Sequence, residues 1–136
     1  MAFTGNYACT TFVSGLLAGT FDFENDTFKI AVYTNDATLN ASTAGYTSSG
    51  EVVASGYTAG GTTLTPVYTT GDTYVTFENV SWSAAFTARG ALVYKADGGS
   101  NPAVCVLDFG ADKTSTTTFT VQFPTATNTT ALIRLS

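Results

Sequence analysis

FTARGALVYKADGGSNPAVCVLDF, residues 86–109, is the stretch that decides the fold. Its two flanks, residues 86–96 and 102–109, are rich in Val, Leu, Tyr and Phe and have the length of β-strands. Between them, Asp97-Gly98-Gly99-Ser100-Asn101 is a strong turn signal, because Gly and Asn accept the backbone conformations that tight turns need. The stretch therefore predicts an antiparallel β-hairpin.

Further strands are predicted on both sides of this hairpin. Residues 27–34 (TFKIAVYT) are apolar on both faces, which is typical of a central strand that is covered on two sides. The remaining strand signals are residues 62–69 and 73–82 around a turn at 70–72, residues 114–123 after a predicted turn at 110–113, and residues 130–135.

Only residues 8–18 have a helical pattern, and Gly19 is placed to end the helix. Apolar residues at spacings of three and four would form one buried face. These residues are Cys9, Phe12, Val13, Leu16 and Leu17.

The elements together predict a mainly β fold, an antiparallel, jelly-roll-like β-sandwich with one short N-terminal α-helix. A chain of 136 residues fits a single domain, 1–136. Within it we expect an N-terminal arm at 1–7, the helix at 8–18 and the sandwich at 26–136. Residues 35–61 are loop-like, and a connection of that length is usually functional or structured on binding.

Composition points to a surface that other protein covers. Charged residues make up 11% of the chain, against about 25% in a typical soluble domain. Thr alone supplies 27 positions, and uncharged hydroxyl groups cost less to desolvate than Lys or Glu. The alternative is a soluble β-domain that is Thr-rich only because Thr is a good strand residue.

The charge pattern argues against nucleic acid as a partner. The net charge is −5, and a phosphate backbone is bound by clustered Lys and Arg. No apolar run approaches the roughly 18 residues of a membrane span, and no secretory signal is evident, so we expect no membrane partner and assembly in the cytosol. The five basic residues are scattered: Lys29, Arg89, Lys95, Lys113 and Arg134.

The sequence offers little for catalysis or cofactor binding. Histidine is absent, so Ser-His-Asp and Cys-His catalysis are excluded, and the usual zinc sets cannot form. Asp22, Glu24 and Asp26 could form a weak calcium site or a glycosidase pair, but a solvated acidic turn is favoured. Cys9 and Cys105 are expected to be buried inert thiols, although a bridge between them stays open. We expect no enzymatic activity, metal or cofactor.

Two groups of residues suggest interactions instead. Arg89 interrupts a strand and is expected to pair with Asp108 on the neighbouring hairpin strand, or to contact a partner. Tyr46, Tyr57 and Tyr68 lie in or beside the long loop. They could stack on sugars or anchor a protein interface, where Tyr is enriched.

Several stretches together resemble one family. They are residues 5–7 through the helix into 26–34, residues 56–61, residues 86–94 and residues 106–110. The chain is similar there to a group of small tailed-phage proteins, often seen among cyanophages. The resemblance implies a virion component and no catalytic residue.

We interpret that component as a capsid cement or decoration protein that binds the major capsid protein and stabilises the head. The alternatives are a carbohydrate- or receptor-binding module of a tail or fibre, or another tail or neck protein. We expect a homo-oligomer whose contact regions are the 35–61 loop and the segment through Tyr7. The candidate interface residues are Phe3, Tyr7, Tyr46, Tyr57 and Arg89.

Overall fold

A computed structural model describes residues 3, 5–69 and 71–135. Among these residues the protein is mainly β, with antiparallel strand pairs and one short helix, as predicted. No helix in this part of the chain has the length and hydropathy needed to cross a membrane. The elements in chain order are β1 (Tyr7–Ala8), α1 (Thr10–Ala18), β2 (Phe28–Tyr33), β3 (Thr62–Thr63), β4 (Pro66–Val67), β5 (Tyr74–Phe77), β6 (Val80–Trp82), β7 (Thr87–Lys95), β8 (Ala103–Thr114), β9 (Phe119–Val121) and β10 (Ile133–Arg134).

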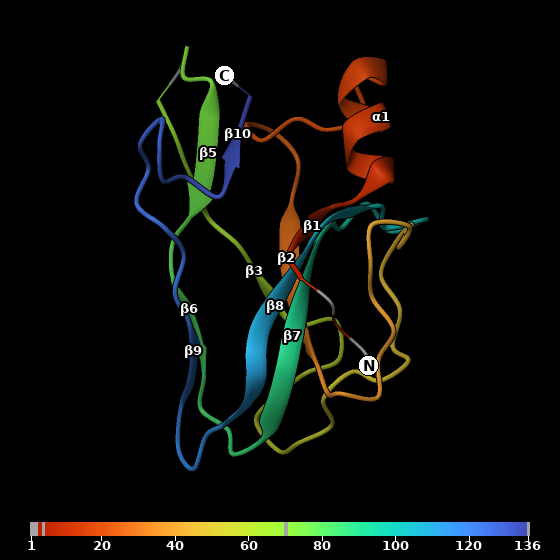
Figure 1. The fold of residues 1–136 in the computed structure, drawn as a ribbon, viewed down its shortest axis with the longest axis vertical. Helices are drawn as coiled ribbons and strands as arrows, with labels where there is room; N and C mark the ends of the chain where they lie inside the picture. Colours follow the sequence, from red (N-terminus) through yellow and green to blue (C-terminus); the bar gives the residue numbers. More distant parts are fainter. Residues whose placement is uncertain (1–2, 4, 70, 136) are drawn as a thin grey trace.

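Three sheets form two layers. A five-stranded sheet has the order β1-β8-β7-β2-β3, and a three-stranded sheet (β10-β5-β4) and a two-stranded sheet (β6-β9) lie across from it (Figure 1). Rings from the two layers meet between them; those of Phe28 and Phe77 lie 6.3 Å apart. This arrangement is sandwich-like, but sheets of five, three and two strands do not establish the eight-stranded jelly roll that the sequence suggested.

The predicted hairpin is the centre of the large sheet. Strands β7 and β8 are antiparallel, and their turn is held by reciprocal side-chain bonds. The Asp97 carboxylate accepts the N–H groups of Gly99 and Asn101, while the Asn101 side-chain oxygen accepts those of Asp97 and Gly98. Such bonds explain why Asp and Asn bracket this turn.

The turn predicted at residues 110–113 is instead an irregularity inside β8. Ala88 pairs with Lys113 and Gly90 with Asp108, so two steps along β7 correspond to five along β8. The extra residues bulge out of the ladder, and Gly110 there has a φ of 83°. Residues 110–113 therefore interrupt the regular pairing, but they form a bulge within the strand and not a turn that ends it.

The central strands are buried on both faces, which confirms the interpretation of residues 27–34. On β2, Ile30 and Val32 belong to a core that lies between the two layers. Ala31 and Tyr33 alternate with them and belong to a second core on the opposite face. The large sheet therefore needs a cover on each side.

The predicted helix is present at Thr10–Ala18 and ends at Gly19, whose φ of 75° is left-handed. Its expected apolar face is only partly correct. Phe12 is buried and Leu16 packs against the first core, but Val13 is 51% exposed and Leu17 is 90% exposed.

Cys9 and Cys105 are both free and buried, so the bridge that the sequence left open does not form. Cys9 belongs to the second core and Cys105 to the first, on opposite faces of the sheet. Burial raises the pKa of the Cys9 thiol to about 11 and that of Cys105 to about 12. Raised values keep both thiols protonated and unreactive near neutral pH.

A glycine substitution tests how tightly β2 is covered. Gly61 has a φ of 78°, and a Cβ there would lie 1.7 Å from the Ile30 carbonyl oxygen. We expect Gly61→Ala to lower the free energy of unfolding by at least about 3 kcal/mol, because backbone must move to admit the methyl group. Urea unfolding followed by circular dichroism measures this loss.

The matched control is Gly98→Ala. Gly98 has nearly the same φ, 76°, but nothing lies within 4 Å of its added Cβ. Gly98→Ala should lower the free energy of unfolding by only about 1 kcal/mol, which is the cost of holding alanine in the left-handed conformation. Equal losses in the two variants would show that crowding at Ile30 is unimportant.

Candidate functional site

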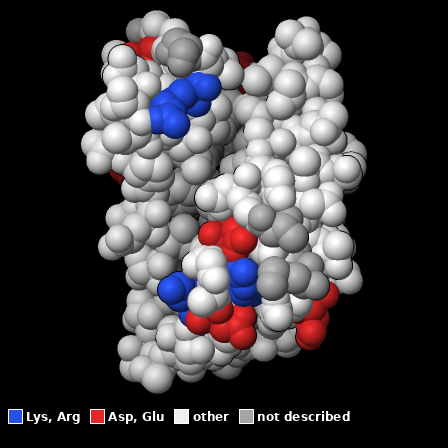
Figure 2. Space-filling model, viewed as in Figure 1, with Lys and Arg blue, Asp and Glu red and all other residues white. Residues whose placement is uncertain are grey.

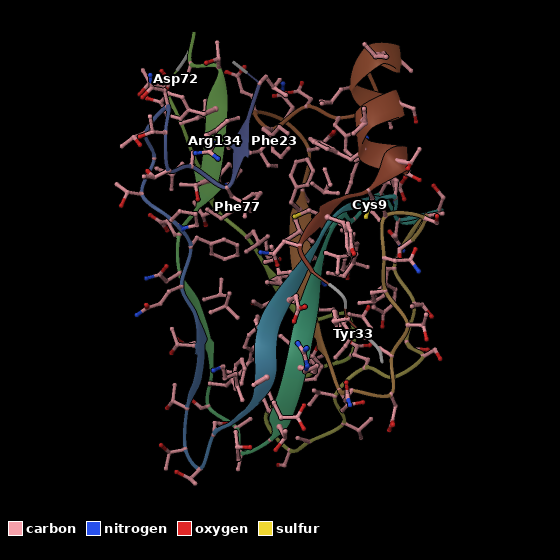
Figure 3. All side chains as sticks on the ribbon, viewed as in Figure 1. Cys9, Phe23, Tyr33, Asp72, Phe77 and Arg134 are labelled. Carbon is pink, nitrogen blue, oxygen red and sulfur yellow. The ribbon has the colours of Figure 1, made fainter. Side chains whose placement is uncertain are left out.

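Residues 35–61, which we call the cover loop, form the lid on the second face of the large sheet. Ala37 and Leu39 are buried there against Tyr33 and Leu92. In Figure 3 the Tyr33 side chain points from β2 toward this loop. The loop is therefore a structural layer, although it contains almost no regular secondary structure.

The cover loop then passes over the outer edge of β2. The Thr34 N–H donates to the Gly50 carbonyl, and the Val52 N–H donates to the Val32 carbonyl. These bonds extend the sheet beyond the short strand β3. Val52 and Tyr57 consequently reach the first core on the other face.

Glu51 is the polar centre of the loop and is only 7% exposed. Its Oε2 accepts the Tyr46 hydroxyl at 2.6 Å, and its Oε1 accepts the Tyr57 hydroxyl at 2.7 Å and the Gly60 N–H at 2.8 Å. Three donors compensate the cost of burying the carboxylate. We call Glu51, Tyr46, Tyr57 and Gly60 the Glu51 clasp.

Hydrogen bonds from the sheet attach the clasp to the core. The Val32 N–H donates to the Tyr57 hydroxyl at 3.0 Å, and the Tyr94 hydroxyl donates to the Gly60 carbonyl at 2.6 Å. The Tyr33 hydroxyl donates to the Thr47 carbonyl at 2.7 Å. The middle and the C-terminal end of the loop are thus fixed to β2 and β7.

The loop tyrosines are therefore not exposed platforms, which corrects the expectation for Tyr57. Tyr57 is only 8% exposed, Tyr46 is half-buried against the Tyr94 ring at 5.0 Å, and the clasp engages both hydroxyls. Sugar stacking on these two rings would require the loop to open. Tyr68 lies elsewhere, at the edge of a hollow beside β5.

The N-terminal candidates are also part of the fold. Phe3 is 1% exposed and packs against Gly90, and the Arg89 guanidinium lies 5.8 Å from the centre of its ring. Tyr7 pairs with Val106 in the large sheet. The expectation of a separable arm at 1–7 is wrong for these residues; residues 1, 2 and 4 lie outside the described part. Phe3 and Arg89 offer little surface to a partner.

The predicted pairing of Arg89 with Asp108 is confirmed. The two side chains form an ion pair between β7 and β8, both mostly buried. Asp108 also accepts the Gly110 N–H, and its own N–H donates to the Asn6 side chain. The pair stabilises the bulged part of β8, so it has a structural role.

The acidic turn is solvated, as favoured from the sequence. Asp22 accepts N–H groups of Glu24 and Asn25 within the turn, and Asp26 pairs with Lys95 at 3.1 Å. In the described residues no three His, Cys, Asp or Glu side chains gather in a way that could hold a metal ion.

Of the contact regions that the sequence suggested, the outer side of the cover loop is exposed. Its 27 residues include only two charged side chains, Asp36 and Glu51, and Glu51 is buried. Val53 is 97% exposed although it is apolar. Sequence reasoning missed Val53, because the burial of its neighbours Glu51 and Val52 depends on the clasp.

Comparisons with known proteins identify no relative. No protein family, no curated protein and no solved structure matches the chain. The residues and their geometry are therefore the basis for any assignment of function.

Replacing Glu51 by Gln tests the clasp. The amide keeps the shape but has one acceptor oxygen in place of two and no negative charge, so the bonds from the three donors are fewer or weaker. We expect a loss of about 1–3 kcal/mol in the free energy of unfolding, measured with urea. Glu78→Gln, at an exposed site on the segment after β5, is the control and should change little. If both variants and the wild type unfolded at the same urea concentration, the Glu51 clasp would not contribute to stability.

Alkaline pH should unfold the protein through its buried tyrosines. Burial, with Glu51 close by, raises the pKa of Tyr94 to about 12 and raises those of Tyr33, Tyr46 and Tyr57 further. Unfolded tyrosines ionise near pH 10. In the folded protein these hydroxyls stay protonated at pH 10. The stability that comes from their raised pKa values is therefore complete below about pH 10 and is lost as the pH rises to 12 and above.

Tyrosinate absorbance and circular dichroism, recorded in the same titration, measure this effect. These four tyrosines should ionise together with the loss of β structure. Ionisation of every tyrosine near pH 10 in a protein that keeps its fold would contradict the described burial.

Proposed function

We propose that this chain is a structural protein of a tailed-phage particle, a cement or decoration protein that binds the major capsid protein through its cover loop. Two things support the proposal: the resemblance of several stretches to small phage proteins, and the form of the loop. The single observation that carries it is an ordered, almost uncharged loop with an exposed apolar residue, Val53, on its outer side.

Pre-organisation makes such a loop suited to binding. A flexible 27-residue segment would lose conformational freedom on contact with a partner, which weakens association. Here the path of the loop is already fixed by the Glu51 clasp and by the hydrogen bonds of Val32 in β2 to Tyr57 and Val52 in the loop. Most of the ordering cost is met during folding, so more of the contact energy contributes to binding.

The low charge of the loop acts in the same direction. Charged groups that are buried at an interface must be desolvated, and unpaired ones weaken the contact. The outer side of the cover loop presents Thr, Ser, Asn and backbone groups, with Asp36 as its one exposed charge. A weak contact of this kind becomes effective when many copies bind one particle.

Copy number in the virion tests the proposal and separates it from its alternatives. Quantitative mass spectrometry of purified virions should find hundreds of copies, near parity with the major capsid protein. A few to a few dozen copies would indicate a tail, neck or fibre protein and favour a carbohydrate- or receptor-binding role. Absence from purified virions would exclude a virion function.

A variant links this count to the cover loop. Virions assembled with Val53→Glu should carry at least about tenfold fewer copies at limiting protein, because the new carboxylate must be desolvated at the contact. Gln122→Glu adds the same charge beyond β9, on an exposed residue outside the loop, and should bind normally. Equal occupancy for both variants would place the contact elsewhere.

A further inference from the structure

A groove lies where the chain crosses from the large sheet to the two-stranded sheet, between the C-terminal part of β8 and β9. Its volume of about 410 Å³ is within the range of small-molecule sites, about 300–1,000 Å³. Every residue that lines it comes from the segment 109–122. One continuous stretch of chain, outside the cover loop, therefore forms the whole groove.

Aromatic rings form the apolar part of this groove. Phe109 is half-buried, and the centre of its ring lies 6.0 Å from that of Phe119. Phe119 belongs to the first core and Phe109 packs against that core, so the fold fixes the Phe109 ring in place. A fixed ring offers a flat apolar surface to the C–H face of a sugar at little cost in conformational freedom.

Polar groups without partners lie beside the rings. Within the described residues, the Lys113 ammonium forms no ion pair, and the side chains of Lys113, Thr118 and Gln122 form no hydrogen bond. The Thr120 hydroxyl, by contrast, is bonded to that of Ser81 at 2.8 Å. The free groups are an ammonium, a hydroxyl and an amide, and together they can donate to and accept from the hydroxyl groups of a ligand.

The local charge of the groove is positive. Lys113 is the one charged residue among the described residues that line it. Asp108 is paired with Arg89, and Asp112 precedes Lys113 in β8 but does not line the groove. Figure 2 shows few charged side chains on the face that it presents, so an ammonium without a partner is an uncommon feature of this surface. A ligand with a carboxylate would supply that partner.

We propose that this groove binds a saccharide that carries a carboxylate, such as a uronic acid or sialic acid unit. The Phe109 ring packs against the C–H face of the sugar, and Lys113 donates to the carboxylate. Thr118 and Gln122 form hydrogen bonds with the sugar hydroxyl groups. This site goes beyond the proposed capsid contact, because it lies outside the cover loop and does not depend on a particle.

Other ligand classes fit the groove less well. A nucleic acid is bound by clustered Lys and Arg, which a groove with one lysine lacks. A purely apolar ligand would bury the free polar groups without partners. Tyr46 and Tyr57, the sugar-stacking residues suggested by the sequence, are held in the Glu51 clasp, whereas Phe109 lines a groove.

Titration of the purified, isotope-labelled chain with trigalacturonate and with sialyllactose, followed by NMR, tests the site. At least one of these acidic probes should shift the amide signals of residues 113–122, with a dissociation constant of about 1 mM or lower. Lys113→Gln should raise that constant at least about fivefold, because a hydrogen bond to a charged group is lost. Lys113 is exposed, so circular dichroism should be unchanged.

Lys29→Gln is the matched control, because it removes the same charge from a lysine outside the groove. It should bind the acidic probe as the wild type does, and maltotriose, a neutral saccharide, should bind at least about fivefold more weakly. The proposal would be overturned by a failure of both acidic probes to shift these signals, by equal constants for Lys113→Gln and Lys29→Gln, or by equally tight binding of maltotriose. Equal shifts with inorganic phosphate would indicate a general anion site and would also overturn it. Because no particle is present, these outcomes are independent of the copy-number measurement on virions.

Discussion

The burial of β2 and β7 on both faces is the constraint on which the rest of the structure depends. Buried apolar residues on both sides of a strand leave neither face for water, so each face must be covered by other parts of the chain. Ile30 and Val32 require one cover, and Ala31 and Tyr33 require another. The small sheets supply the first cover. The described part of the chain forms no further sheet for the other face, and the cover loop takes that place.

Covering a sheet with a loop creates a further requirement, because irregular backbone must find partners for its polar groups. The Glu51 clasp meets this requirement where the loop passes over the edge of β2. A buried carboxylate can accept several bonds at once, which suits a crossing where donors arrive from Tyr46, Tyr57 and Gly60. Phe3 completes the cover at the other end, against Gly90, where a larger residue would collide with its ring.

Local patterns predicted the fold where local interactions determine it. Neighbours in sequence, or across one turn, determine three features that were predicted correctly. They are the hairpin at 86–109, the end of the helix at Gly19 and the ion pair of Arg89 with Asp108. The failures depend on distant contacts. Tyr57 resembled a surface residue because its burial depends on contacts far away in the sequence, with Val32 of β2 and with the first core. Leu17 fitted the apolar helical face, but no described part of the chain packs over it, and it is 90% exposed.

The few charged residues explain the character of the outer surface. Of 15 charged side chains, counted as 5 basic and 10 acidic, Glu51 forms the clasp, and Arg89, Asp108, Lys95 and Asp26 are paired within the fold. The charge available to keep separate molecules in solution is therefore smaller than the composition suggests. Surfaces such as the cover loop and the uncharged exposed side of α1 cost little to desolvate, so association with protein partners meets little electrostatic opposition there. A third of the charged side chains, five of 15, thus act within the fold and not as free surface charge.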